Sequence, residues 1–350
     1  MTSERLPVWL DCDPGHDDAF AILLAARHPY FDLLGISTVH GNSSLQKVTN
    51  NALSLLTAFG KSEVPVYPGA KKPYMRPAIH APDIHGETGI DGTNLLPTPL
   101  TAAQTMNAPE AMRNAIMATP KGTCALVVTG TMTNAALMFA TFPETAEHIK
   151  CISIMGGAFT LGNITSVAEF NIYCDPESAS SIFTLPALSG KIILAPLDLT
   201  HTVPATEPVR ESLMISATPF RTMLHDLLMF FAATYARVFD MNDGPPLHDP
   251  LAVAALLPES FGLGFEFEEA SVEVVLHGKE IGRTIMRKPE EMADANRHEG
   301  LELLKDGEEG SELTGVKVKV GKRVDVVKFW ELIMQVVGSA DAVSPVNIVA

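Results

Sequence analysis

The sequence is poor in basic residues. It has 25 Lys and Arg against 41 Asp and Glu in 350 residues, a net charge of −16 with histidine neutral. Proteins that bind nucleic acids cover phosphates with clustered Lys and Arg, and an anionic membrane surface repels an acidic chain. The charge therefore argues against both nucleic acid and membrane as partners.

Cysteine is also scarce, and long apolar segments are missing. The four cysteines lie far apart and form no CxxC pair, so neither a zinc ribbon nor a disulfide scaffold is indicated. We interpret them as reduced core thiols. The longest uncharged run, between Lys121 and Glu144, carries the polar segment 129–134 at its middle, which a membrane span would not. No secretory signal opens the chain, so we expect a cytoplasmic protein.

Short apolar runs alternate with helical patterns over the first 200 residues. The patterns predict strands at 7–10, 33–39, 124–128, 151–155 and 191–197, and helices at 19–28, 48–59, 134–142 and 175–185. Strands that are apolar throughout and alternate with helices are typical of a parallel sheet covered on both faces. We predict an α/β fold, with ligands beyond the carboxyl ends of the strands.

The later third of the chain has a different pattern. It predicts one long helical region at 207–239, a helix at 248–257, a β-rich segment at 269–286, an extended segment at 316–327 and a last helix at 326–338. Residues 265–313 carry 14 acidic and 6 basic residues, which we interpret as solvated surface. No repeat or linker divides the chain. We expect one domain over 1–350, with a core at 7–260 and a small β-rich C-terminal extension, 261–350, packed on it.

The main chemical signal is the segment Asp11-Cys12-Asp13-Pro14-Gly15-His16-Asp17-Asp18, which lies directly after a strand and before a helix. One carboxylate is enough to cap a helix. Four carboxylates within eight residues repel one another unless a cation joins them. Hard oxygen ligands without nearby cysteine favour Ca²⁺ or Mg²⁺ over zinc. The segment therefore predicts a metal site.

Other motifs are incomplete. Gly60-Lys61-Ser62 ends like a phosphate-binding loop, but Leu55 stands where that loop needs glycine. No GxGxxG follows a strand, and no HExxH or GxSxG occurs. An aspartyl-phosphate phosphatase would continue its DxD signature with Thr or Val, where this chain has Gly15.

The acidic segment and several later blocks, taken together, resemble the inosine–uridine-preferring nucleoside hydrolases. The blocks occur in the family's order and span about residues 7–260. After the acidic segment come Val39-His-Gly-Asn42, His85-Gly-Glu-Thr-Gly-Ile-Asp-Gly92, Val128-Thr-Gly130 with Thr133-Asn134, Met155-Gly-Gly157, Ala168-Glu-Phe-Asn171 with Asp175-Pro176, and His248-Asp249-Pro250. Within the family, the segments at 9–16, 34–38 and 82–85 look most like fungal uridine nucleosidases. The resemblance implies the family's Rossmann-like fold.

The resemblance also implies a set of ligands. Ca²⁺ would be held by Asp13, Asp18, the backbone carbonyl of Thr129 and Asp249. The 2′-hydroxyl of ribose would bind Asp17 and Asn171, and the 3′ side would bind Asp249 and Asn42. Asn163 and Glu169 would bind the 5′-hydroxyl, while Met155 and Phe170 would lie against the sugar. An isolated asparagine more often forms a turn, but Asn42 and Asn171 lie inside matching blocks, and Asn163 lies between two of them.

The implied reaction is hydrolysis of the N-glycosidic bond of a ribonucleoside to ribose and free base. Asp13 would act as the general base toward water. His248 is the first candidate for the acid that protonates the leaving base, and His85 is the second. Tyr235 and Arg237 are candidates to close over the base, although both are equally typical of an ordinary helix.

The sequence leaves several alternatives open. The base is expected to be uracil, but a purine preference or nicotinamide riboside as substrate stays possible. A ribose-binding relative without activity is the competing class, and the presence of Asp13 argues against it. The resemblance further implies nucleoside salvage and a homodimer or homotetramer.

Overall fold

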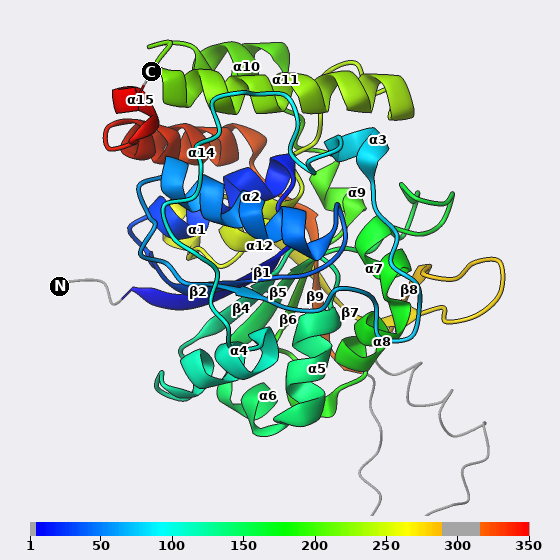
Figure 1. Cartoon of the computed structure of the whole chain (residues 1–350). Helices are drawn as coiled ribbons and strands as arrows, with labels where there is room; N and C mark the ends of the chain where they lie inside the picture. The colour runs from blue at the N-terminus through cyan, green and yellow to red at the C-terminus, as the bar shows by residue number, and fades with distance from the viewer. Residues whose placement is uncertain (1–4, 289–315, 350) are drawn as a thin grey trace, which may run out of the picture.

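The computed structural model describes residues 5–288 and 316–349, and within them nine strands form one sheet (Figure 1). The order across the sheet is β3-β2-β1-β4-β5-β6-β9-β7-β8. The strands are β1 (Leu6–Cys12), β2 (Phe31–Thr38), β3 (Val66–Pro68), β4 (Ala125–Val128), β5 (Cys151–Met155), β6 (Ile192–Ala195), β7 (Glu266–Val274), β8 (Thr284–Arg287) and β9 (Val318–Arg323). From β3 to β9 all neighbours pair in parallel, while β7 is antiparallel to both β9 and β8.

Helices cover both faces of this sheet (Figure 1). On one face lie α1 (His16–Arg27), α2 (Leu45–Ala58), α10 (Glu207–Leu213), α11 (Pro219–Phe239), α12 (Asp249–Ala254), α14 (Val326–Asp341) and α15 (Val346–Val349). The other face packs against α4 (Ala108–Met117), α5 (Thr133–Thr141), α6 (Glu144–His148) and α8 (Pro176–Phe183). Near the carboxyl ends of the strands lie α3 (Pro82–His85), α7 (Phe170–Cys174) and α9 (Leu197–Thr200), and two short 3₁₀ turns occupy Pro186–Leu188 and Glu259–Phe261.

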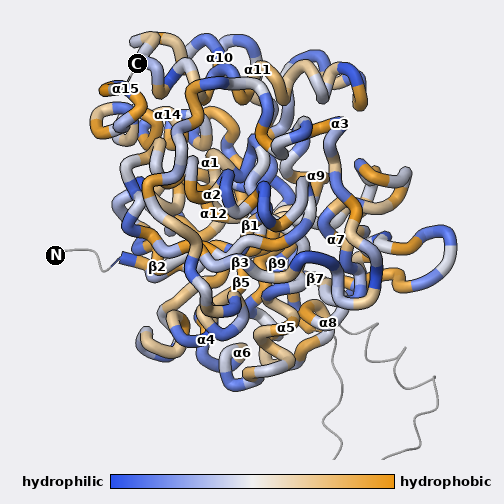
Figure 2. The backbone as a smooth tube through the Cα atoms, in the orientation of Figure 1, coloured by the Kyte–Doolittle hydropathy of each residue, from blue (hydrophilic) through white to orange (hydrophobic). Residues whose placement is uncertain are grey.

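Two buried clusters, one on each face, form the core. Alternate residues of β1 divide between them, because side chains on a strand point to opposite faces. Val8 and Leu10 join the cluster under α1 and α11, whereas Trp9 joins the cluster under α4 and α5. Figure 2 shows the hydrophobic segments concentrated along these central strands. The prediction of a mostly parallel sheet with helices on both faces is confirmed.

Two predicted features differ from the structure. The expected long helix at 207–239 is two helices, because Ala217 adopts a φ of 43° and Thr218 with Pro219 starts α11. The hydroxyl of Thr218 caps α11 by accepting from the backbone N–H of Arg221. The β-rich C-terminal segment also does more than pack on the core, because β9 pairs in parallel with β6 inside the central sheet.

The acidic stretch is described in part. Exposed glutamates of β7 form ion pairs, Glu268 with Lys322 of β9 and Glu269 with Lys317 just before β9, which agrees with solvated surface. The part of that stretch from residue 289 to 313 lies outside the described residues. None of the helices in the described ranges combines the length and the hydropathy that a membrane crossing requires.

The sheet brings three strand ends together. Strand β4 lies between β1 and β5, with Asp11 opposite Val128 and Val128 opposite Ile154. Because these strands are parallel, the residues that follow them emerge at one edge of the sheet. Asp13, Thr129 and Gly156 therefore start neighbouring loops.

Candidate active site

Four buried aspartates form the floor of the site. Asp13 follows β1, Asp17 and Asp18 begin α1, and Asp249 begins α12; the most exposed of them, Asp17, is 5% exposed. Carboxylate oxygens of Asp17, Asp18 and Asp249 lie within 4.8 Å of one another. Burial, and then repulsion between these carboxylates, raises the pKa of Asp13 and Asp249 well above the usual value and that of Asp17 to about 7.

Asp13 lies in space that two glycines keep open. Its Oδ2 accepts a hydrogen bond of 2.7 Å from the backbone N–H of Asn42. Its Oδ1 is buried and has no hydrogen-bond partner among the described residues. A Cβ on Gly41 would lie 1.9 Å from Oδ2, and one on Gly130 would lie 2.5 Å from Oδ1. The loops after β2 and β4 can approach Asp13 only because both positions are glycine.

These residues fit a hard divalent cation. Asp17, Asp18 and Asp249 form one buried cluster, and the nearby Asp13 has a buried oxygen without a partner among the described residues. Such carboxylates need positive charge or protons to coexist. The oxygen-only donor set suits Ca²⁺ or Mg²⁺. Thr129 joins the cluster, since its hydroxyl donates to Asp18 Oδ1 at 2.9 Å. Its carbonyl, which the resemblance assigns to the metal, accepts from the Asn171 amide at 2.9 Å and keeps a second lone pair.

A cavity opens above the floor, and polar side chains and aromatic rings line it together. All the predicted substrate and catalytic residues except Asp13 line this cavity. The predicted metal ligand Asp18 does not line it either. The lining residues are Asp17, Asn42, Ala81, Ile84, His85, Thr129, Met155, Asn163, Ile164, Glu169, Phe170, Asn171, Phe231, Tyr235, Phe239, His248 and Asp249.

One wall is built on α7. Glu169 caps this helix and accepts hydrogen bonds from the backbone N–H groups of Gly157, Asn171 and Ile172. Burial raises its pKa even though those three bonds oppose the shift. The side-chain oxygen of Asn163 accepts from the backbone N–H of Phe170 at 2.9 Å. Glu169 therefore shapes the wall as well as lining it.

A second wall of the cavity is formed by aromatic side chains of α11, and the sequence did not predict its phenylalanines. Phe231, Tyr235 and Phe239 recur every four residues, which places them on one face of α11. That spacing is visible in the sequence, but it is equally typical of a helix facing an ordinary core. The structure gives Tyr235 a place in the cavity. It does not place Arg237 there, because the guanidinium donates to the Asp83 carbonyl at 2.9 Å instead.

His248 is held between two hydroxyls at the edge of the floor. Its Nε2 lies 2.8 Å from the Tyr235 hydroxyl, and its Nδ1 lies 2.7 Å from the hydroxyl of Thr200. Burial, and then the neighbouring His201, holds the pKa of His248 well below its usual value. A neutral imidazole joined to a phenol in this way can pass a proton along the pair.

Comparisons with known proteins agree with this site. A model of the family described as inosine-uridine preferring nucleoside hydrolase matches residues 8–331. The uridine nucleosidase of Saccharomyces cerevisiae is 38% identical over 99% of this chain and 100% of its own. The pyrimidine-specific ribonucleoside hydrolase RihA of Citrobacter koseri is 43% identical over 73% of this chain and 81% of its own.

Solved structures give the same result at lower identity. The plant nucleoside hydrolase PpNRh1 has a TM-score of 0.79 and 28% identity, covering 95% of this chain and 99% of its own. The purine-preferring ribonucleoside hydrolase of Gardnerella vaginalis has a TM-score of 0.81 and 27% identity, covering 96% and 100%. With a family match over nearly its whole length, the chain belongs to the inosine-uridine preferring nucleoside hydrolases and is an N-glycosidase.

Proposed function

We propose that this enzyme is a Ca²⁺-dependent hydrolase of pyrimidine ribonucleosides, with uridine as its preferred substrate. The observation that carries the proposal is the buried carboxylate floor beneath a cavity lined by both polar and aromatic side chains. Asp13, Asp18, Asp249 and the Thr129 carbonyl would hold Ca²⁺, and the close approach of Asp17 makes it a neighbour of the same ion. Bound Ca²⁺ would make a coordinated water more acidic.

The residues of the chain have separate tasks in this scheme. Asp13 takes a proton from water, which attacks C1′ of the ribose as the bond to the base breaks. Asp17, Asn42 and Asn171 orient the ribose, and the surrounding carboxylates favour the positive charge that develops on the sugar. The Tyr235–His248 pair would relay a proton from solvent to the departing base, so that both residues keep their protons overall. One-step attack by water predicts inversion at C1′.

The uridine preference rests on the relatives. The proteins at 38% and 43% identity carry names that specify uridine or pyrimidine nucleosides, while the purine-preferring structure is 27% identical. The second candidate function is therefore purine nucleoside or nicotinamide riboside hydrolysis on the same floor. A ribose-binding relative without activity is the third. We further propose a homodimer or homotetramer that acts in cytoplasmic nucleoside salvage.

The test is release of free base from uridine, cytidine, inosine and nicotinamide riboside, each with and without added Ca²⁺. We expect kcat/KM to be highest for uridine and the ribose to form with inverted configuration, as followed by proton NMR. A higher kcat/KM for inosine would replace the pyrimidine assignment. Failure to cleave all four nucleosides would refute the hydrolase assignment itself.

A further inference from the structure

His16 lies under the aromatic wall and has no task in the scheme above. It is fully buried, and its ring is parallel to those of Phe230 and Phe231, with centroids 5.2 Å apart. Its Nε2 lies 2.7 Å from the backbone carbonyl of Asp91, and its Nδ1 lies 3.1 Å from Nδ1 of His85. His85 lines the cavity, so His16 connects that cavity to the loop at 86–91.

The first contact fixes where His16 carries its proton. A carbonyl oxygen accepts hydrogen bonds only, so Nε2 of His16 must bear hydrogen. The other nitrogen of a neutral His16 is then a bare acceptor, and Nδ1 of His85 must donate to it. A doubly protonated His16 would reverse this bond. The His16 ring is fully buried between two phenylalanine rings, and such surroundings disfavour that cation.

The loop at 86–91, which follows His85, holds the Asp91 carbonyl in place beside His16. The Asp91 carboxylate accepts from the backbone N–H groups of Glu87 and Thr88, and the Asp91 N–H donates to the His85 carbonyl at 3.1 Å. Gly86, with a φ of 78°, allows the turn. These contacts give a structural reason for the sequence from His85 to Asp91, which the proposed reaction leaves unexplained.

His85 is confined on its other sides as well. A Cβ on Gly15 would lie 2.5 Å from its Nδ1 and 2.6 Å from its Cε1, and its ring stacks on Phe231. The Thr234 hydroxyl and Arg237 donate to the carbonyls of Ile84 and Asp83, which fastens α3 to α11. With Nδ1 directed at His16, the remaining ring nitrogen, Nε2, is the polar atom that His85 offers to the cavity.

We propose that His16 is a positioning residue that fixes the tautomer of His85, so that His85 presents an unprotonated Nε2 to the cavity and accepts a hydrogen bond from an N–H group of the bound base. His85 lies beside the aromatic side chains Phe231 and Tyr235, which suit a flat base, whereas the asparagines and carboxylates suit a sugar. In uracil the ring N–H available is N3–H. In this state His85 has no proton at Nε2 to give to a leaving group, which leaves that role to His248.

The tautomer can be measured without any substrate, by long-range ¹H–¹⁵N correlation spectra of enzyme with ¹⁵N-labelled histidine. Two other histidines serve as internal references: Nδ1 of His80 donates to the Gly41 carbonyl, and Nε2 of His148 donates to the Thr119 carbonyl. We expect His85 to match His80 and His16 to match His148. A proton on Nε2 of His85, or two protons on His16, would overturn the proposal.

Two variants separate tautomer control from packing. His16→Phe keeps a ring between the phenylalanines but removes the acceptor, so His85 should shift toward the Nε2–H form. His16→Asn keeps an oxygen near the position of Nδ1 and should restore the Nδ1–H form. If His85 keeps its tautomer in His16→Phe, or if His16→Asn behaves like His16→Phe, His16 does not control it.

The role of His85 in recognising the base rests on the proposed function, and its test needs substrates. The probes are uridine and 3-deazauridine, in which C–H replaces N3–H. We expect the ratio of their kcat/KM values to fall about tenfold in His16→Phe, the worth of one hydrogen bond, and to recover in His16→Asn. An unchanged ratio would refute recognition by His85. Inactivity of the wild-type enzyme on uridine would refute the proposed function, while the spectra would still decide the tautomer.

Discussion

Asp13 is the residue on which the proposed chemistry depends most. Asp13→Asn keeps the shape of the side chain and its acceptor toward the Asn42 N–H, but it removes the base. We expect kcat for uridine to fall about 10²–10⁴-fold, the usual contribution of a positioned general base, while the protein stays folded. Steady-state kinetics with circular dichroism as the check on folding would measure this.

Asp11 provides the matched control, two residues earlier on β1. It is equally buried, but its Oδ1 accepts from the Ser37 hydroxyl and the Asn134 amide, whereas the Oδ1 of Asp13 has no partner among the described residues. Asp11→Asn should reduce kcat less than tenfold. If both variants lose the same rate, Asp13 acts through packing and is not the base.

Gly41 is the second residue whose identity the site requires. Gly41→Ala would place a methyl group 1.9 Å from Asp13 Oδ2, so the carboxylate must move. Displacing a catalytic group by about 1 Å can cost about 10²-fold in rate, and we expect kcat/KM to fall by that order. In Gly338→Ala, the added Cβ lies 3.7 Å from its nearest neighbour and should leave kcat/KM unchanged. Wild-type kinetics in Gly41→Ala would contradict the geometry given for Asp13.

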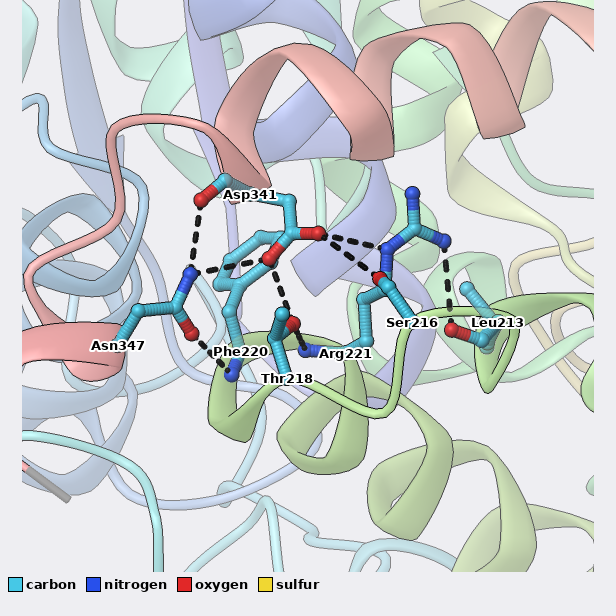
Figure 3. A network of polar contacts seen from close by, with 7 residues as sticks. All are labelled: Leu213, Ser216, Thr218, Phe220, Arg221, Asp341 and Asn347. Carbon is cyan, nitrogen blue, oxygen red and sulfur yellow. Dashed lines mark hydrogen bonds and ion pairs between the residues drawn. The ribbon is translucent and has the colours of Figure 1, made fainter.

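At the scale of elements, α11 carries the aromatic wall, and its other end is anchored by Asp341 of α14. Figure 3 shows the Asp341 carboxylate between Arg221, Thr218 and Asn347. Its oxygens accept from Arg221 Nε at 2.7 Å and from the Thr218 hydroxyl at 2.6 Å. Burial alone would raise the pKa of Asp341, but hydrogen bonds from Thr218, Asn347 and Arg221 lower it. The anchor thus ties the start of α11 to the end of the chain.

Removing that anchor should destabilise the protein. Asp341→Ala leaves the Arg221 guanidinium, which is 14% exposed, without its carboxylate. We expect the free energy of unfolding to fall by about 2–3 kcal/mol, measured by urea denaturation. Glu273→Ala breaks an exposed pair with Arg287 and should change it by less than about 0.5 kcal/mol. Equal effects of the two substitutions would show that the Asp341 contacts are not an anchor.

The sequence predicts most elements because local patterns decide them. Strand β5 (Cys151–Met155) has the predicted bounds, and the strong apolar runs of β1 and β4 are within two residues of theirs. The short strand β3 and the four-residue helix α3 were not predicted, because each depends on contacts with distant segments. The break at Ala217 is likewise set by a positive φ that the apolar pattern hides.

Some residues of the candidate site could also be predicted from the sequence, and others could not. Asp13, Asp17 and Asp18 could be found because they belong to a group of four carboxylates within eight residues, whereas Asp249 was predicted only through the family resemblance. The contribution of Phe231 and Phe239 could not, because a helix face pointing at a ligand and one pointing at a core have the same spacing. Nor could the pairing of His16 with His85, which joins residues 69 apart in the sequence.

For the whole molecule, we expect the carboxylate floor to make stability depend on pH and on the proposed Ca²⁺. Burial, and then Asp18, raises the pKa of Asp17 from 3.8 to about 7 in the folded protein. Between pH 3.8 and about 7, Asp17 is protonated in the folded protein but ionised in the unfolded chain. The stability that Asp17 contributes is therefore fully present below pH 3.8 and is lost as the pH rises through about 7. Without Ca²⁺, the floor is least favourable above pH 7.

Protons and Ca²⁺ compete for the same carboxylates, so Ca²⁺ should raise Tm most at high pH, where the carboxylates have lost their protons. At a concentration about a hundredfold above Kd, the cation adds about 2.7 kcal/mol of stability, which corresponds to a few degrees in Tm. We expect that rise at about pH 8 and a smaller one at about pH 5, measured by differential scanning calorimetry. Asp249→Asn should remove the difference. If the rise in Tm does not depend on pH, or persists in Asp249→Asn, the cation does not bind at the carboxylate floor.

We propose that the carboxylate floor makes the cavity above it the active site of a cation-dependent N-glycosidase. The most direct test of this proposal is the rate of uracil release from uridine, measured by absorbance after treatment with a chelator and again after Ca²⁺ is restored. We expect the chelator to abolish hydrolysis of uridine and Ca²⁺ to restore it. An undiminished rate in the presence of the chelator would contradict the proposal.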